Sequence, residues 1–510
     1  MTKKPEVFRL LKSFNNEDYL EFDKFLRSPY LNRFSSLIII FEFVCSNKDM
    51  ILNENIYELE NLIREKSKFS KSTVNKLFTY LTYAVLDYYR IKCVIKDEIY
   101  LQLRLNDYLL NIEEYKLLDA SQIKLDENIL NSNTIMEDSF LYSHLQNNNL
   151  YATSISNNNL WKNKENDSLT YIKNSTNDIY LFSLIQSIYN YVNFIIKKIN
   201  INRDDLNWNS VNLDSYLIAG EEIIYYDKNM NRQIVFNLYK KLYLAFKNLY
   251  IDDFYQDYKS FFFEYIKTFN IDTVIKHFEL LTGYCLARER SNDNNNYFSY
   301  EWLNLTNQKM NLENSDNTSN KYLRAFQFRN YIIKCFALYD HVHLLNFIEK
   351  YSIRLSPIDY KEMLNYGMAH YYYLIYDYKK ALKCLNNIKI NYYFYKYDLT
   401  NLELKIYFDK YNIDLIERAI HNYNELLKHD TFLTKLDKIR LKKLLSYYQK
   451  LIYLPEKLKL DNKYLDDVYI LKSQLGVESN FAMRKWLIQK VDELIFKFDK
   501  DTVNKEIKNK

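Results

Sequence analysis

The feature of this sequence that most restricts its fold is a spacing that occurs three times between residues 328 and 423. Each occurrence has four side chains separated by gaps of three, nine and four residues. Gaps of three and four place side chains on one face of an α-helix, and a gap of nine spans a helix end and a turn. The pattern predicts pairs of antiparallel helices packed closely together. The three sets are Ile332, Cys335, Leu344 and Ile348; Ala369, Tyr372, Ala381 and Leu385; and Leu404, Tyr407, Ile416 and Ile420.

The three sets follow one another at a nearly constant step. Leu344, Ala381 and Ile416 hold the same place in the pattern and are separated by 37 and then 35 residues. Repeats made of a helix, a turn and a second helix have a period of about 34 residues. Between the first two sets, Ser356 stands directly before Pro357. This pair is typical of a helix start, because serine caps free amides and proline at the first helical position loses no hydrogen bond.

These residues resemble the tetratricopeptide-like superfamily of helical repeats. The glycine usual in its first helix is Ala369 in one unit and Ile332 or Leu404 in the others, and its terminal proline is absent. Because the shared motifs are packing motifs, the resemblance implies a fold and almost no activity. A second resemblance, to an uncharacterised bacterial group of helical-repeat proteins, is carried by residues 22–32, 328–334, 366–388 and 402–411.

Composition supports the same fold class. The chain has only four glycines and four prolines in 510 residues, whereas average usage is about 7% and 5%. Few tight turns or bulges can form from so little, which disfavours β-rich and dinucleotide-binding architectures. We predict an all-α fold, a right-handed α-solenoid of tetratricopeptide-like helical hairpins with an N-terminal helical cap.

Four parts are expected along the chain. Residues 1–92 form the N-terminal helical cap, and residues 93–320 form an irregular helical-repeat region with asparagine-rich loops. Residues 321–500 hold the tetratricopeptide-like repeats and a C-terminal capping helix, and residues 501–510 form a frayed tail. The stretches expected to be loops or breaks, because asparagine and serine favour turns over helix interiors, are residues 146–149, 157–159, 291–296 and 311–320.

No motif for catalysis, nucleotide binding or metal binding is present in the sequence. The four glycines lie far apart, so no phosphate-binding loop can be formed. His341 and His343 would point about 200° apart on a regular helix, and no third ligand accompanies them. His277, His370 and His421 are isolated in the sequence, which disfavours a catalytic role for each. We expect a non-enzyme with no catalytic residues, no cofactor and no metal.

The excess of aromatic residues, 51 tyrosines and 31 phenylalanines, admits two interpretations. It suits a base-stacking or sugar-binding surface, or it reflects AT-rich codons, which favour Asn, Lys, Ile, Tyr and Phe over Gly, Pro and Ala. Because most of these aromatics fall at core spacings, we favour the second interpretation.

The five cysteines are scattered and odd in number, which is typical of reduced thiols in a cytoplasmic protein. The apolar run at residues 37–41 is far shorter than the roughly 20 residues of a membrane span. We therefore expect a cytoplasmic location and no membrane partner.

The function expected is a protein–protein interaction scaffold or adaptor whose partner is another protein. In solenoids of this class the first helix of each pair lines the concave surface, so side chains there are candidates for partner binding. An alternative for the aromatic members is packing within the protein. The candidate residues, which the resemblance implies are exposed on these first helices, are Arg329, Phe336, Tyr366, His370, Tyr373, Asn401, Lys405 and Phe408.

A second hypothesis is a nucleic-acid-associated regulator that uses a basic C-terminal face. The net charge of +5, from 70 basic and 65 acidic residues, supports a polyanion partner only weakly. A solvated helix face is the plainer interpretation of the basic stretch. That stretch comprises Lys435, Lys438, Arg440, Lys442 and Lys443.

Overall fold

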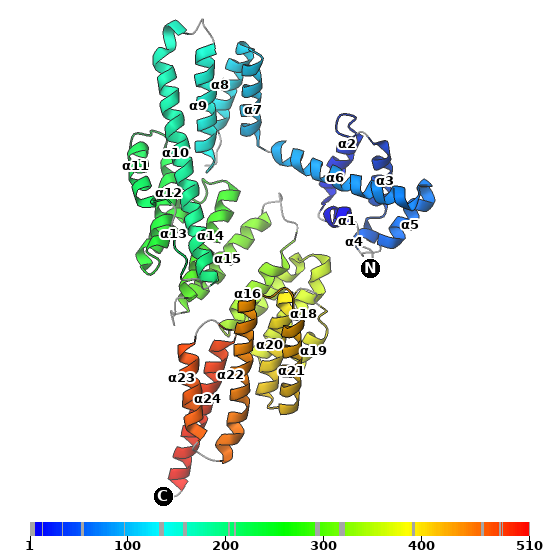
Figure 1. The fold of residues 1–510 in the computed structure, drawn as a ribbon, viewed down its shortest axis with the longest axis vertical. Helices are drawn as coiled ribbons and strands as arrows, with labels where there is room; N and C mark the ends of the chain where they lie inside the picture. Colours follow the sequence, from blue (N-terminus) through cyan, green and yellow to red (C-terminus); the bar gives the residue numbers. More distant parts are fainter. Residues whose placement is uncertain are drawn as a thin grey trace. The chain divides into compact units, whose positions relative to one another are not determined.

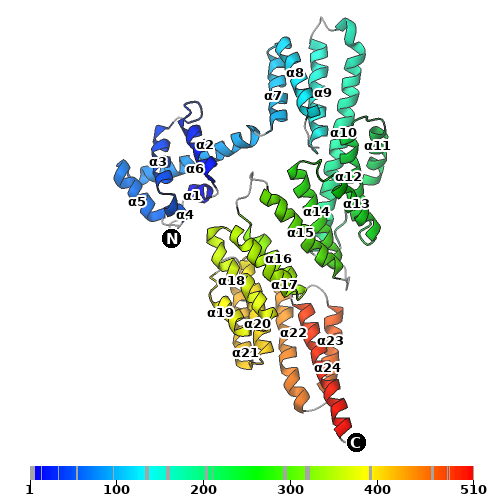
Figure 2. The same cartoon turned by 180° about the vertical axis from the view of Figure 1, so that it is seen from behind.

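The computed structural model shows an all-α protein (Figures 1 and 2). No strand occurs in the part of the chain that the structure describes, where the only β-type contact is an isolated bridge between Leu323 and Leu355. The described residues are 6–12, 14–32, 34–52, 56–95, 97–131, 137–156, 161–201, 205–208, 211–290, 296–315, 322–389, 393–460, 464–478, 481 and 483–508.

The helices follow one another in this order: α1 (Glu6–Leu11), α2 (Asn16–Arg27), α3 (Ser35–Ser46), α4 (Lys48–Leu52), α5 (Ile56–Ser67), α6 (Lys71–Ile95), α7 (Glu98–Asn111), α8 (Tyr115–Asn131), α9 (Ser139–Ser156), α10 (Trp161–Asn200), α11 (Leu213–Tyr225), α12 (Met230–Lys247), α13 (Asp252–Tyr265), α14 (Ile271–Arg290), α15 (Tyr297–Ser315), α16 (Ala325–Ala337), α17 (His341–Tyr351), the 3-10 turn η1 (Ser352–Arg354), α18 (Pro357–Leu374), α19 (Tyr378–Asn386), α20 (Tyr393–Asp409), α21 (Ile413–His429), α22 (Lys435–Leu460), α23 (Leu465–Val477) and α24 (Arg484–Lys508).

The chain forms two compact units. Unit 1 comprises Met1–Ile196 and Asn207–Leu281, and unit 2 comprises Lys197–Leu206 and Thr282–Lys510. The domain boundaries predicted from the sequence divide the chain differently and stay a prediction.

Unit 1 begins with a hydrophobic cluster that runs from Val7 to Tyr88, inside the expected N-terminal cap. Its second helix starts at a capping box, in which Asn15 accepts from the Asp18 amide and the Asp18 side chain accepts from the Asn15 amide. Further along the unit, α7 contacts α8 and α9, and α12 contacts α13. Neighbouring helices therefore supply most of the packing in this unit.

Close helix packing in unit 1 explains one glycine. A Cβ atom at Gly220 in α11 would lie 2.8 Å from both Leu184 of α10 and Phe236 of α12. A larger residue would require the Leu184 and Phe236 side chains to move, so glycine favours the close approach of these three helices.

In unit 2 the helices predicted from the repeated spacing are confirmed as consecutive contacting pairs, α16 with α17, α18 with α19 and α20 with α21. The first helices of the pairs, α16, α18 and α20, also contact one another in turn (Figures 1 and 2). The predicted cap is confirmed as well, because the Ser356 hydroxyl accepts from the Asp359 amide and Pro357 opens α18.

The side chains of the repeated spacing are mostly at the centre of these pairs. Only Tyr372 and Tyr407 are half-buried. The ten others are buried: Ile332, Cys335, Leu344, Ile348, Ala369, Ala381, Leu385, Leu404, Ile416 and Ile420.

The expected breaks have different outcomes. The loop predicted at residues 146–149 is wrong, because these residues lie inside α9. Gln146 and Asn149 are buried there, and the Asn149 carbonyl accepts a hydrogen bond from the Thr153 hydroxyl. Packing and local bonding outweigh the weak helix preference of these residues. Residues 157–159, 291–295 and 316–320 lie outside the described residues, whereas residues 311–315 are the last turn of α15. At the C-terminus α24 continues to Lys508, into the part expected to be frayed.

One helical segment, Ser168–Ile199 in α10, is long and apolar enough to cross a membrane by length and composition. Length and composition alone do not separate a membrane span from a long helix of a packed core. This segment carries Asp178, which forms an ion pair with Arg232 of α12, and its Leu184 and Ile188 are buried in unit 1.

Candidate functional site

The candidate residues from the sequence lie on the inner row of unit 2, by which we mean α16, α18 and α20. The expectation that they are exposed is wrong for Tyr366, His370 and Tyr373, whose exposed fractions are 0%, 1% and 6%. The alternative of internal packing is correct for these aromatic side chains. The other five are half-buried: Arg329, Phe336, Asn401, Lys405 and Phe408.

At one end of the inner row, Arg329 of α16 forms an ion pair with Asp398 of α20, with its Nη2 atom 2.8 Å from Oδ1. Tyr366 is on α18, which contacts both α16 and α20. Its hydroxyl donates to Asp398 Oδ2 at 2.9 Å. Burial opposes the charge of Arg329, but Asp398 overcomes it and raises the pKa of the guanidinium. Three successive first helices are therefore joined by one half-buried carboxylate, which is a structural arrangement.

At the other end, side chains of the inner row meet α24. Trp486 of α24 donates from Nε1 to the Tyr373 hydroxyl at 3.1 Å, and that hydroxyl donates to Asp409 Oδ2 at 2.8 Å. Lys490, one turn along α24, lies 2.9 Å from Asp409 Oδ1. The Trp486 ring also packs edge-on against Phe408. The first turns of α24 thus cover this part of the inner row.

This cover is part of the core of unit 2. Trp486, Leu487 and Val491 belong to the hydrophobic cluster that also contains buried side chains of α22 and α23. Detaching α24 from the rest of the unit would expose these three side chains together, at about 1.5–3 kcal/mol each. The inner row beneath α24 is therefore a packed interface within the unit, as expected of a capping helix.

Each of the three turns that join paired helices holds an exposed tyrosine. We call these three residues the turn tyrosines. Tyr339, Tyr376 and Tyr411 are 47%, 77% and 39% exposed. They are separated by 37 and 35 residues, the same steps as the spacing. In each turn the amide after the tyrosine donates to the carbonyl five residues earlier. These bonds are Asp340 to Cys335 at 3.0 Å, Asp377 to Tyr372 at 2.9 Å and Asn412 to Tyr407 at 3.1 Å.

All three turn tyrosines have a left-handed backbone, with φ of 56°, 62° and 50° for Tyr339, Tyr376 and Tyr411. This is the position after a helix at which glycine, and next asparagine, is favoured. A bulky residue there is an outlier that costs on the order of 1–3 kcal/mol. Codon bias does not account for tyrosine here, because asparagine shares the AT-rich codons and fits the conformation better.

The second helix of each pair starts directly after its turn tyrosine. Asp340, Asp377 and Asn412 cap α17, α19 and α21, and each side chain accepts a backbone amide at 3.0 Å. The turns therefore have well-satisfied backbones, and the strain is confined to the tyrosine itself. Sequence reasoning missed the turn tyrosines, although their 37- and 35-residue steps were available to find them.

Unit 1 holds a buried polar cluster that the sequence did not indicate. His277 Nδ1 lies 2.7 Å from the Tyr258 hydroxyl, and its Nε2 lies 3.2 Å from Glu137, which also forms an ion pair with Lys276 at 2.5 Å. Burial would raise the pKa of Glu137, but the hydrogen bond and charges of His277 and Lys276 lower it to about 2. His277 and Tyr258 are fully buried, so the contacts of this imidazole are internal to unit 1.

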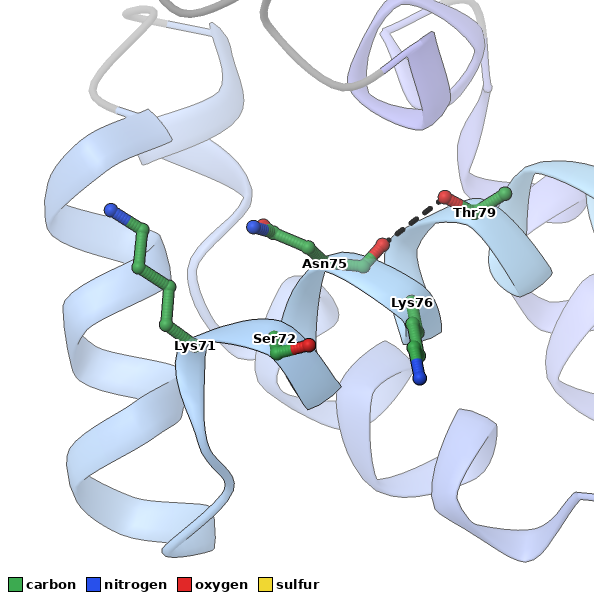
Figure 3. A pocket seen from close by; sticks show the side chains of 5 residues that line it. All are labelled: Lys71, Ser72, Asn75, Lys76 and Thr79. Carbon is green, nitrogen blue, oxygen red and sulfur yellow. Dashed lines mark hydrogen bonds between the residues drawn. The ribbon is translucent and has the colours of Figure 1, made fainter.

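A shallow hollow lies at the start of α6 (Figure 3). Lys71, Ser72, Asn75, Lys76 and Thr79 line it, and the Thr79 hydroxyl donates to the Asn75 carbonyl at 3.1 Å. Figure 3 shows Lys71 and Asn75 pointing to one side and Lys76 pointing away from them, so the two ammonium groups do not converge on one ligand.

The other sequence candidates have ordinary contacts. His343 lies 2.7 Å from the capping Asp340. No group of three histidine, cysteine or acidic side chains suited to a metal occurs among the residues searched, which are those the structure describes. In the basic stretch, Arg440 lies 3.6 Å from Asp437 and Lys443 lies 3.0 Å from Glu478. These ion pairs reduce the charge available to a polyanion.

Comparison with known proteins found no match: no family model, no curated protein and no solved structure resembles the chain closely enough to be assigned.

Proposed function

We propose that this protein is a non-enzymatic scaffold or adaptor that binds another protein. We further propose that its helix pairs form a right-handed α-solenoid of tetratricopeptide-like hairpins with an N-terminal helical cap. The consecutive helix contacts and the identical hydrogen-bond pattern of the three turns support this architecture. The free thiols of all five cysteines fit a cytoplasmic location.

The partner surface in this proposal is the row of turn tyrosines, and the single observation that carries it is their repeated strain. Side chains held in a sparsely populated backbone conformation cluster at functional sites. Tyrosine supplies large, rigid contact area with a polar end and is enriched in protein interfaces. Three exposed tyrosines, each at the cost of an unfavourable φ, therefore suit a surface that contacts a partner.

The inner row is a less suitable partner site than the sequence indicated. Its aromatic side chains are buried, and α24 covers one end of it as part of the core. Arg329, Asn401 and the other half-buried members act chiefly in contacts between helices, as the Arg329–Asp398 pair illustrates. The turn tyrosines lie at the ends of the same helices and stay exposed.

The test is site-specific photo-crosslinking in the native host. A photoreactive phenylalanine analogue placed at position 339, 376 or 411 should form crosslinks to a second protein. The matched controls are Tyr469 for position 339, Tyr57 for position 376 and Tyr360 for position 411, which are 46%, 72% and 39% exposed but lie on helices. Crosslinks at the controls and not at the turns would refute the proposed surface.

A second experiment separates binding from folding. The triple variant Tyr339→Asn, Tyr376→Asn, Tyr411→Asn places a more suitable residue at each left-handed position, so the fold should be kept or stabilised. Partner capture should nevertheless be lost. An unchanged set of captured proteins would eliminate the turn tyrosines as the binding surface.

A further inference from the structure

The turn tyrosines form a row in which neighbours are one helix pair apart. The first helices of the pairs meet at the ends from which the turns start. The Phe336 ring of α16 lies 5.4 Å from the Tyr373 ring of α18, and the Tyr373 hydroxyl donates to Asp409 of α20 at 2.8 Å. Packed helices lie about 8–10 Å apart. The three turns are therefore neighbours in order, at intervals of about that size.

The three rings leave their turns in the same direction. The backbone φ angles of Tyr339, Tyr376 and Tyr411 are 56°, 62° and 50°, and an equivalent hydrogen bond closes each turn. The backbone fixes the direction of each Cα–Cβ bond. Equivalent backbones in successive helix pairs thus present a line of aromatic side chains at regular intervals.

The interval selects the conformation of a ligand that contacts all three rings. A polyproline II helix has three residues per turn and rises about 3.1 Å per residue, so every third residue lies on one face at intervals of about 9.3 Å. A β-strand repeats on one face every two residues, or about 6.6 Å. An α-helix repeats about every 5.4 Å and docks its apolar face in a groove, whereas exposed ring tips form a ridge. The polyproline II interval is the one that fits.

The polar groups beside the rings complement proline. A proline residue carries a carbonyl acceptor and no amide donor. The hydroxyl of the exposed Tyr376 and the ammonium groups of the exposed Lys379 and Lys410 are donors at this row. The carboxylates of Asp340 and Asp377, which follow two of the tyrosines, lie 2.7 and 2.9 Å from basic side chains of their own helices. The row therefore offers donors to a backbone that supplies acceptors.

We propose that the turn tyrosines bind a proline-rich segment of a partner protein in the polyproline II conformation, with one proline on each ring. Such a segment is formed before binding and loses little conformational entropy when it docks on aromatic side chains. Contacts to the first and third rings are six residues apart, so seven residues are the shortest segment that reaches all three. This inference rests on the proposed function, because it names the chemistry of the partner that the same surface takes.

The test is binding of dye-labelled oligoprolines to the full chain, measured by fluorescence anisotropy. Affinity should increase at least about tenfold from four to eight residues, because the longer peptide reaches the third ring, and less than about threefold from eight to twelve. Two peptides of equal composition test the interval. PAAPAAP, with a proline at every third residue, should bind at least about threefold more tightly than PAPAPAA.

Variants locate the binding site on the protein. Tyr339→Asn, Tyr376→Asn and Tyr411→Asn should each weaken binding of the eight-residue oligoproline at least about threefold, and the triple variant should abolish it. The control Tyr469→Asn, at an exposed position of α23, should leave the affinity unchanged. Equal affinities for the four- and eight-residue peptides, or binding that survives in the triple variant, would overturn the proposal.

The crosslinking experiment separates this inference from the proposed function. A segment that crosslinks to position 339, 376 or 411 should contain prolines three residues apart, as identified by peptide mass spectrometry. A crosslinked segment without proline, such as an amphipathic helix, would refute the polyproline inference and leave the proposed surface in place. Crosslinks at the control positions alone would refute the surface itself.

Discussion

Replacing Tyr376 measures the strain on which the proposed binding surface rests. Tyr376 has φ of 62° and is 77% exposed, so its side chain makes few contacts that a substitution would remove. Its ring neighbour is Tyr378, at 6.3 Å. The informative comparison is between Tyr376→Asn and Tyr376→Val, because both variants lose the same ring contact and differ in how well they tolerate a left-handed backbone.

The left-handed conformation costs an ordinary side chain roughly 1–2 kcal/mol, and asparagine avoids much of this through local hydrogen bonds. A β-branched side chain fits it worst. We therefore expect Tyr376→Asn to be more stable than Tyr376→Val by about 1–2 kcal/mol, with the wild-type protein between them.

The assay is native-state hydrogen exchange, because the chain has two compact units and need not unfold in one step. The reporters are the amides of Tyr376 and Asp377, which donate to the carbonyls of Tyr373 and Tyr372 at 3.0 and 2.9 Å. Their opening free energies should follow the order Asn, Tyr, Val.

A control separates backbone strain from helix preference. Lys383 is exposed within α19, and asparagine and valine have similar helix propensities. Lys383→Asn and Lys383→Val should therefore agree within about 0.5 kcal/mol. Equal protection in Tyr376→Asn and Tyr376→Val would show that residue 376 is not held in a left-handed conformation, and the argument from strain would fail.

Three further predictions concern stability. Burial lowers the pKa of Lys405 to about 7, so the unfolded chain binds more protons between pH 7 and the ordinary lysine pKa, and the wild-type protein should gain about 2 kcal/mol relative to Lys405→Met between pH 7 and 9; a constant difference in denaturant unfolding would contradict the lowered pKa. Glu137→Gln leaves Lys276 without its buried carboxylate and should destabilise unit 1 by roughly 3 kcal/mol. Because the Glu137 pKa is lowered to about 2, this difference should disappear as pH falls from about 4.5 to 2 in acid unfolding, and a difference that persists below pH 2 would argue against an ionised Glu137. Ser356→Ala removes the cap of α18 and should cost about 1 kcal/mol, measured by exchange of the Asp359 amide, with Ser356→Asp as the variant that restores it.

Local chemistry explains what could be predicted from the sequence. The cap at Ser356 and Pro357 depends on residues within one helical turn, and the buried positions Leu344, Ala381 and Ile416 depend on a periodicity that any pair of packed helices must satisfy. The helical class follows from the scarcity of glycine and proline in the same way. Such features need no knowledge of distant parts of the chain.

The predicted exposure of Tyr366, His370 and Tyr373 failed for the opposite reason. Helical spacing places these side chains on one face of α18. Whether that face meets solvent depends on α16, α20 and α24, which are distant in the sequence. Tyr373 and its hydrogen-bond partner Trp486, for example, are 113 residues apart. The contact between Lys405 and Phe336 and the contact between Glu137 and His277 likewise join residues 69 and 140 positions apart. The sequence alone determined the helix pairs between residues 325 and 429 and which of their faces are apolar, because those properties are local. Only the tertiary structure decided what covers each face, and that residues 146–149 continue a helix, because burial is set by neighbours distant in the chain.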